Sequence, residues 1–288
     1  MNFQHNFGPV LNDTKTYLKA RNPPMNALSL SLAIREVMLT ADPTAKVMAT
    51  RDVARRWRAG ELDFCFRHPI PDTPARPAQP QLLPPGAMPK RGRGGTERGR
   101  IALLHALAHI EFVAIDLALD AAGRFGAQMG RDFVDDWLSV AADEAMHFSL
   151  LARRLRTLGS FYGALPAHDG LWDAARDTAH DVAARLAIVP MVLEARALDV
   201  TPGTVARFLA ADDERSARIL QRIVDDEIRH VRFGTKHFIA VCESRGEQPP
   251  ESWKMLVARH FHGAVKPPFN DSARRSAGLS REFMAGVA

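Results

Sequence analysis

Two short segments of the chain repeat one pattern, "DEAMH" at 143–147 and "DEIRH" at 226–230. In a helix, residues three positions apart share a face, so each segment presents a glutamate and a histidine side by side. A carboxylate beside an imidazole is a ligand pair for a transition metal such as iron. One such pair is common on a solvated helix face, but both segments here lie among apolar residues. The pattern therefore predicts metal ligands at Glu144 with His147 and at Glu227 with His230.

Two further glutamates interrupt the apolar stripes of other helical segments, Glu111 in "ALAHIEFVAI" and Glu194 in "IVPMVLEARAL". Each precedes the glutamate of a repeated segment by the same 33 residues. Four glutamates in one core would repel each other unless cations lay among them. One glutamate from each of two helices, with Glu-x-x-His from each of the other two, is the ligand set of di-iron and di-manganese carboxylate bundles. We therefore expect two irons, with manganese or a mixed Fe/Mn pair as alternatives.

The aspartates that begin the two segments, Asp143 and Asp226, lie beside this face. A metal-bound histidine nearly always donates its other ring N–H to an acceptor, often a carboxylate. Each aspartate can therefore hold the histidine of the opposite helix, Asp143 with His230 and Asp226 with His147. The alternative is that both aspartates are merely exposed acids.

Other polar residues near these positions have different expected roles. Pro190, one turn before Glu194, lacks a backbone donor and should kink its helix near the site. His105, His109 and Asp116 are rotated away from Glu111. We expect them to form a separate hydrogen-bonded contact beneath the N-terminal part of the chain.

The elements that must position these residues are helices between 101 and 244. Periodic apolar residues predict helices over 101–125, with Gly123 near the end, over 131–159 and over 171–199. A fourth is expected after Thr201–Pro202, running to about 244. With no convincing strand between them, the sequence predicts an all-α protein built on an antiparallel four-helix bundle.

The remaining segments differ in composition. Residues 1–68 are expected to be a helical extension, with caps at Asn26 and Asp42. Residues 69–100 form a proline/glycine-rich basic arm: 69–89 hold eight of the 19 prolines, and a basic run follows over Lys90–Arg100. This arm is either a flexible linker or a segment wrapped over the surface. The tail, 245–288, should hold one helix around Trp253–His262.

Composition limits the class of protein. The formal charge is +5 and the pI is about 9.5. This mild basic excess would fit an RNA partner, but the favoured interpretation is a charged surface that only keeps the protein soluble. The two cysteines, Cys65 and Cys242, form no motif, and no secretory signal is visible. No apolar run reaches the roughly 18 residues of a spanning helix. We expect a cytoplasmic protein with no membrane contact.

The phrases "HALAHIEFVAIDLALD", "DEAMHFSLL", "VLEARALDV" and "DDEIRHVRFG" resemble the ferritin-like superfamily of helical di-iron carboxylate proteins. They resemble more narrowly a bacterial ferritin-like family of unknown function. The resemblance implies all six residues named above as metal ligands, with Glu144 and Glu227 as the bridging pair.

Two positions depart from better-known members of that superfamily. Small subunits of ribonucleotide reductase carry a radical tyrosine one turn after the first histidine, where this chain has Leu151. Several monooxygenases carry a threonine one turn after the third-helix glutamate, where this chain has Leu198. Radical storage is therefore disfavoured, and the two leucines would give an apolar wall suited to a hydrocarbon-like part of a substrate.

These observations lead to one main expectation of function and two alternatives. The first is an O2-activating oxidoreductase or hydroxylase, acting on a small organic molecule or on RNA, as a tRNA hydroxylase of the superfamily does. It would need an electron donor, and a homodimer is an open assembly state. The basic runs at Lys90–Arg100 and Arg153–Arg156 make RNA admissible. The alternatives are iron binding, storage or peroxide detoxification without an organic substrate, and a non-catalytic bundle. The sequence names no catalytic residue beyond the metal ligands.

Overall fold

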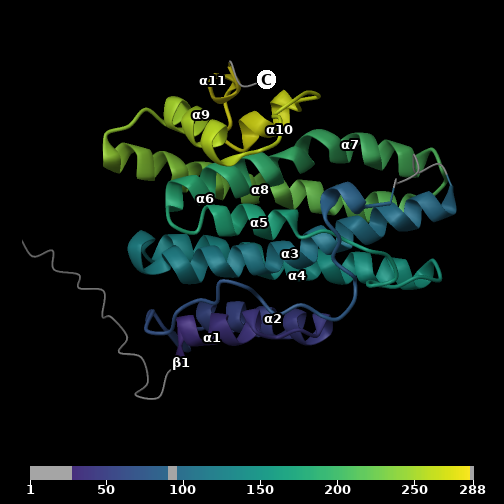
Figure 1. The fold of residues 1–288 in the computed structure, drawn as a ribbon, viewed down its shortest axis with the longest axis horizontal. Helices are drawn as coiled ribbons and strands as arrows, with labels where there is room; N and C mark the ends of the chain where they lie inside the picture. The colour runs from purple at the N-terminus through teal and green to yellow at the C-terminus, as the bar shows by residue number, and fades with distance from the viewer. Residues whose placement is uncertain (1–27, 90–95, 286–288) are drawn as a thin grey trace, which may run out of the picture.

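The computed structural model describes residues 28–89 and 96–285, and this part of the chain is mostly helical. Its strands, β1 (Leu28–Ser29) and β2 (Leu62–Asp63), have two residues each and pair with each other in parallel. The all-α prediction is therefore confirmed. Figure 1 shows the N-terminal helices on one side, the long helices in the middle, and the C-terminal helices on the other side.

The middle layer holds the residues predicted to do chemistry. It consists of α3 (Glu97–Met129), α4 (Arg131–Thr157), α8 (Glu214–Arg245) and a segmented third rod. That rod contains α6 (Val182–Ile188), the π-helical segment η2 (Val189–Glu194) and α7 (Ala195–Leu209). The short α5 (Gly170–Asp177) precedes it.

Helices α4 and α8 are antiparallel, as two polar contacts along their interface show. Near the start of α4, Asp136 Oδ2 lies 2.8 Å from His237 Nε2, late in α8. Near the end of α4, Arg154 Nε donates to Ser216 Oγ, early in α8, at 2.8 Å. The register between these contacts brings the two repeated segments opposite each other.

Helix α3 is long and apolar enough to cross a membrane by length and composition alone. Its most apolar 18-residue window is 67% buried inside the protein. Phe112, Ile115 and Leu119 are fully buried in the common core. The apolarity of α3 is thus accounted for by packing, and the cytoplasmic location stays a prediction.

The N-terminal extension packs against α3 and α4. Its helices are α1 (Leu30–Met38) and α2 (Pro43–Arg58). Asp42 caps α2 as expected, because its side chain accepts from Ala45 N at 2.7 Å. The expected cap Asn26 lies outside the described residues, and α1 begins later than that cap implied.

The described part of the proline-rich arm, 69–89, follows the surface rather than forming a separate linker. Ala75 N donates to Met38 O at 2.8 Å, Asp72 O accepts from Trp172 Nε1 at 3.2 Å, and Leu83 N donates to Ala167 O at 2.8 Å. The arm contains the 3-10 turn η1 (Pro85–Ala87). Residues 90–95 of the basic run lie outside the described part, and residues 97–100, placed in the arm by sequence, form the first turn of α3.

Gly123 does not end its helix as expected, since α3 continues to Met129 and turns at Gly130 with φ of +89°. A Cβ at Gly123 would lie 2.5 Å from Ile70 Cδ1. A Cβ at Gly126 would lie 2.7 Å from the ring of Phe66. Both glycines therefore allow the extension and the arm to approach α3 closely.

The predicted third helix, 171–199, is wrong in its continuity and in its end. The helix is interrupted between α5 and α6, and Asp181 caps α6 by accepting a hydrogen bond from Ala183 N at 3.1 Å. The buried Arg185 stabilises this break, since it donates to Thr178 Oγ1 at 3.1 Å and also pairs with Asp120 of α3. The cap at Asp181 and the ion pair between Arg185 and Asp120 therefore stabilise an interruption where the apolar periodicity predicted a continuous helix.

The third rod also runs through Pro202, where a new helix was expected to begin. Pro202 has no N–H, so the carbonyl of Leu198 loses its usual partner four residues on. Asn270 of the C-terminal tail donates its side-chain amide to Leu198 O at 3.2 Å. This contact replaces the missing bond, and α8 begins only at Glu214, after the cap Asp213.

The C-terminal tail has three helices where one was expected: α9 (Pro249–His260), α10 (Asp271–Ser276) and α11 (Arg281–Met284). The buried Arg274 binds Asp199 of α7 through two hydrogen bonds of 2.8 and 2.7 Å. Trp253 is fully buried and donates to Ala187 O at 3.3 Å, beside the π-helical segment. The tail therefore fastens the third rod at two places.

The close approach of Pro190 to α8 yields a test by substitution. A Cβ at Gly234 would lie 2.4 Å from Pro190 Cβ and Cγ, so we expect Gly234→Ala to lower the free energy of unfolding by about 1–3 kcal/mol. Gly203 is also helical but has nothing within 4 Å of its Cβ position, so Gly203→Ala should stabilise by about 0.5–1 kcal/mol. Urea denaturation measures both, and equal effects would contradict the packing.

Candidate metal centre

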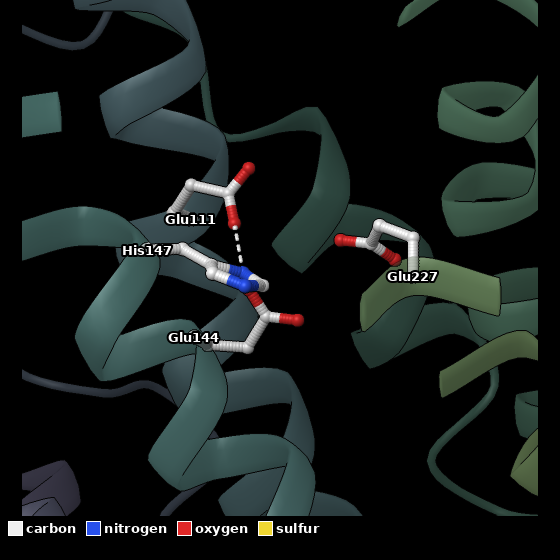
Figure 2. Close-up of side chains that lie close together, drawn as sticks. All are labelled: Glu111, Glu144, His147 and Glu227. Atoms are coloured by element: carbon white, nitrogen blue, oxygen red, sulfur yellow. Dashed lines mark hydrogen bonds and ion pairs between the residues drawn. The ribbon is translucent and has the colours of Figure 1, made fainter. Parts of the chain in front are cut away.

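Four of the six predicted ligands lie together in the core. Glu111, Glu144, His147 and Glu227 each offer one ligand atom, and these atoms all lie within 4.8 Å of one another. Each residue is at most 5% exposed. In Figure 2, Glu227 of α8 points across the interface towards the other three, which come from α3 and α4. The group is a buried site that can hold a metal ion.

Both histidines turn the same ring nitrogen, Nδ1, towards the glutamates. His147 Nδ1 lies 3.1 Å from Glu111 Oε2 and 3.3 Å from Glu144 Oε2. His230 Nδ1 lies 2.9 Å from Glu144 Oε1 and 3.6 Å from Glu227 Oε2. Glu144 is thus shared between the two imidazoles, while the ring centroids stay 5.9 Å apart.

The opposite nitrogens, Nε2, face the aspartates of the opposite helix. His147 Nε2 lies 3.1 Å from Asp226 Oδ2, and His230 Nε2 lies 3.2 Å from Asp143 Oδ2. These are the two crossing contacts expected from the sequence. They fix the orientation of each ring and leave each Nδ1 directed into the cluster.

Each aspartate is in turn held by an arginine, a feature that sequence reasoning missed. Arg222 Nε donates to Asp226 Oδ2 at 2.6 Å, and Arg229 Nη2 donates to Asp143 Oδ2 at 2.5 Å. On α8, Arg222 lies four residues before Asp226, and Arg229 lies directly before His230. The signal was present as "QRIVDDEIRH", where two arginines flank the acids.

The remaining glutamate, Glu194, approaches from the third rod. It is the last residue of η2, the π-helical segment that begins next to Pro190. The proline therefore produces a widened helical turn at the predicted position rather than a simple kink, and π-helical turns are frequent at functional sites. The residue is partly exposed, but its Oε2 is fully enclosed. Glu194 and His230 lie outside the tight group of four.

Several buried polar atoms of this site have no hydrogen-bond partner among the described residues. Burying a polar atom without a partner costs free energy, and native proteins rarely tolerate it. A bound cation would accept lone pairs from such atoms. Glu194 Oε2 and Glu227 Oε2 are two of them. Glu144 Oε1 and His230 Nδ1 lie 2.9 Å apart as an ion pair, but their geometry is not that of a hydrogen bond.

Burial and mutual repulsion raise the pKa of three of the glutamates. Burial is the main cause, and the charge of Glu144 adds to it for Glu111 and Glu227. For Glu194, whose pKa rises well above the ordinary value, Glu227 adds more than Glu144. Burial also acts on Glu144, but hydrogen bonds from both imidazoles outweigh it and lower its pKa.

The pKa values of His147 and His230 shift upward, whereas burial alone lowers the pKa of an imidazole. The surrounding carboxylates outweigh the effect of burial. Asp226, Glu111 and Glu144 raise the pKa of His147 to about 12. The pKa of His230 is also raised well above its ordinary value, chiefly by Asp143 and Glu144. Without a metal, protons therefore supply the positive charge of the cluster.

The other polar residues of α3 lie apart from the cluster, as expected. Asp116 is fully buried, pairs with Lys46 Nζ at 2.6 Å and also binds Arg76 of the arm. His105 accepts from Gly163 N at 2.9 Å, and His109 Nδ1 lies 3.0 Å from the hydroxyl of Tyr162. Asp116 thus lies beneath the extension and the arm, whereas the histidines contact the loop after α4.

Tyr162 packs closer to the site than its loop position suggested. Its ring lies 5.4 Å from that of Phe112 and 4.9 Å from that of Phe148, the residues that follow Glu111 and His147. Burial raises the pKa of its phenol above the ordinary value. No pattern in the sequence indicated this contact, because it depends on how the 158–169 loop returns over α3.

The two leucines expected to form an apolar wall, Leu151 and Leu198, are both fully buried in the core. Their burial agrees with dry surroundings for the cluster. A contact between them and a substrate stays a prediction.

A family comparison covers most of the chain. The model of a family described as "Protein of unknown function (DUF455)" matches residues 39–285. The chain belongs to this family. An uncharacterized protein of Haemophilus influenzae (strain Rd) is 42% identical over 225 residues, which cover 76% of this chain and 78% of the relative. No solved structure matches the chain.

These findings place the chain in a bacterial family of unknown function, as the narrower resemblance implied. The matched region includes all eight residues singled out for the site, so the candidate centre lies wholly within the part shared with the family. The description of the family and that of the relative name no activity. The chemistry must therefore be argued from the site itself.

The crossing contact between α4 and α8 predicts one mutational effect. Asp226→Asn removes the acceptor charge that orients His147, so metal affinity should fall by about 10- to 100-fold. Asp225→Asn is a matched control, because Asp225 is exposed and accepts a hydrogen bond from Gln221 of the same helix. Anaerobic Fe(II) titration measures both variants, and equal affinities would contradict the role of Asp226.

The raised pKa values predict the pH dependence of metal binding. The raised pKa values of Glu111, Glu194, Glu227 and His147 mean that each group loses its proton at a higher pH than usual, and a cation needs these groups deprotonated. Metal binding should therefore release protons, and the apparent affinity should rise with pH. Calorimetry of Mn(II) binding in buffers of different ionisation enthalpy counts these protons. A proton count of zero, with an affinity independent of pH, would contradict the charge balance described above.

Proposed function

We propose that this member of the DUF455 family is a ferritin-like di-iron carboxylate protein that activates O2 to oxidise or hydroxylate an organic substrate. The observation that carries the proposal is the convergence of the two repeated segments, with their shared Glu144, in one buried cluster. A structural zinc site is closed and commonly cysteine-rich, whereas this donor set is carboxylate and imidazole only. Such donors suit iron or manganese with positions left for O2.

The six residues divide into two equivalent halves. Glu111, Glu144 and His147 would hold one ion, and Glu194, Glu227 and His230 would hold the other. Glu144 would serve both halves, and the approach of its two oxygens to different imidazoles supports this role. Glu227 is the corresponding residue of the second half and would complete the bridging pair.

When bound and reduced, the iron pair would supply the electrons for binding and cleaving O2. The protein contributes the surroundings. Asp143 and Asp226 hold the imidazoles in place. The buried rings of Phe112 and Phe148, with the partly buried ring of Tyr162, would exclude water on one side. Glu111 and Glu144 could accept or release a proton as the charge of the centre changes, since both contact His147 Nδ1.

The ordered cover over α3 favours a substrate-directed enzyme over a simple iron store. Helices α1 and α2 and the proline-rich arm pack on the bundle, and Arg76 of the arm is ion-paired with Asp116. A storage bundle needs no such cover. An electron donor is required for turnover. Iron storage or peroxide detoxification is the alternative, and RNA as substrate and homodimer formation stay predictions.

Metal stoichiometry tests the proposal directly. The purified protein, loaded anaerobically with Fe(II), should bind two ions per chain and show magnetic coupling between them by Mössbauer spectroscopy. Glu194→Gln should reduce the stoichiometry to about one, because Glu194 belongs to one half only. Glu251→Gln is the control, since Glu251 is 70% exposed and pairs with Lys254.

Exposure to O2 separates the candidate functions. Consumption of O2 coupled to added reductant, with about two irons retained, supports an oxidoreductase. Loading far above two irons per chain would instead indicate storage. A stable protein that binds no iron would contradict both and leave a structural bundle.

A further inference from the structure

A cleft of about 400 Å³ lies between α4 and α8 and is lined by arginines from both helices. It is close to the metal centre: Leu150 of its wall follows His147 by one turn of α4, and Arg222 precedes Asp226 by one turn of α8. No acidic residue is among those lining it. The five lining arginines are Arg153, Arg154, Arg215, Arg218 and Arg222.

Nearby carboxylates offset only part of this positive charge. Arg154 pairs with Asp213 at 2.7 Å and Arg218 with Glu214 at 3.0 Å. Asp213 is also 3.8 Å from Arg100, so its charge is shared.

The negative charge of the third carboxylate, Asp226, is shared among three cations. This carboxylate lies 2.6 Å from Arg222, 3.7 Å from Arg229 and 3.1 Å from His147. Arg153 and Arg215 have no ion pair within 28–89 and 96–285. Three of the five guanidinium groups are therefore paired, and two of their three carboxylates, Asp213 and Asp226, also contact other cations.

The spacing on α8 concentrates this charge on one face. Arg215, Arg218 and Arg222 follow each other at three and four residues, where like charges repel each other along a helix. A bound anion would remove that repulsion. Guanidinium groups in pairs match the oxygens of a phosphate and bind it through two parallel hydrogen bonds.

We propose that this arginine cleft binds the phosphoryl group of a small phosphorylated ligand of about nucleotide size. A volume near 400 Å³ suits such a ligand, and Leu150 and Ile219 provide an apolar surface beside the arginines for its uncharged part. Exposed acids lie near the cleft along α8, at Glu214 and Asp225. They would repel a long polyanion that continued along α8, so an extended RNA strand is disfavoured.

The cleft also contacts the machinery of the candidate centre. Arg222 both lines the cleft and donates to Asp226, which in turn holds His147. If the proposed function holds, on which this step rests, the phosphoryl group anchors the substrate beside the His147 half of the centre. Phosphate binding itself does not require a metal.

The test uses the full chain without metal. Isothermal calorimetry with pyrophosphate and with AMP should give dissociation constants below about 1 mM, weakening with added salt. Arg153→Gln with Arg215→Gln should weaken binding at least about tenfold, because two guanidinium contacts are lost. The matched control is Arg51→Gln with Arg259→Gln, which removes the same charge from two exposed arginines that lie outside the cleft.

The outcomes are distinguishable. Affinity for pyrophosphate that falls in the cleft variant but not in the control supports the proposal, and each single cleft substitution should show a smaller loss in the same direction. No measurable binding of pyrophosphate or AMP, or equal losses in both double variants, would overturn it. Binding of a 20-nucleotide RNA without binding of pyrophosphate would also overturn it. Failure of iron loading, with phosphate binding intact, would reject the proposed function alone.

Discussion

Mutual repulsion among buried carboxylates is the constraint on which the rest of this structure depends. Glu111, Glu144 and Glu227 are buried, and their ligand atoms lie within 4.8 Å of one another. Such a group is stable only with positive charge among its members, whether protons or metal ions. The imidazoles of His147 and His230, each held by an aspartate, provide the place for that charge. The surrounding helices must keep all of them aligned to fractions of an ångström.

The part of this arrangement that the sequence predicted depends on regular helix geometry. Glu144 and His147 share a face because they are three residues apart, and the equal 33-residue spacing indicated two matched hairpins. The same geometry placed Asp143 and Asp226 next to the opposite histidines. The helices α3, α4 and α8 carry these residues, and their long uninterrupted periodicity made them predictable to within a few residues at most of their ends.

The third rod was not predictable, because its irregularities are stabilised by contacts far away in sequence. Pro202 should have ended a helix, but Asn270 supplies the donor that the proline lacks. Pro190 fits against α8 only because position 234 is glycine. The contact of Arg229 with Asp143 and the packing of Tyr162 were missed for the same reason, because each depends on tertiary contacts. The pair of Arg222 and Asp226 differs, since the two residues are four positions apart on α8 and their spacing was visible in the sequence.

The reciprocal aspartate–histidine contacts also make the two hairpins interdependent. His147 of the first hairpin is oriented by Asp226 of the second, and His230 of the second by Asp143 of the first. A shift of α4 against α8 by a single residue would break both contacts at once. Neither half can therefore be excised, exchanged or re-registered as a self-sufficient module, although each contains a complete glutamate and Glu-x-x-His set.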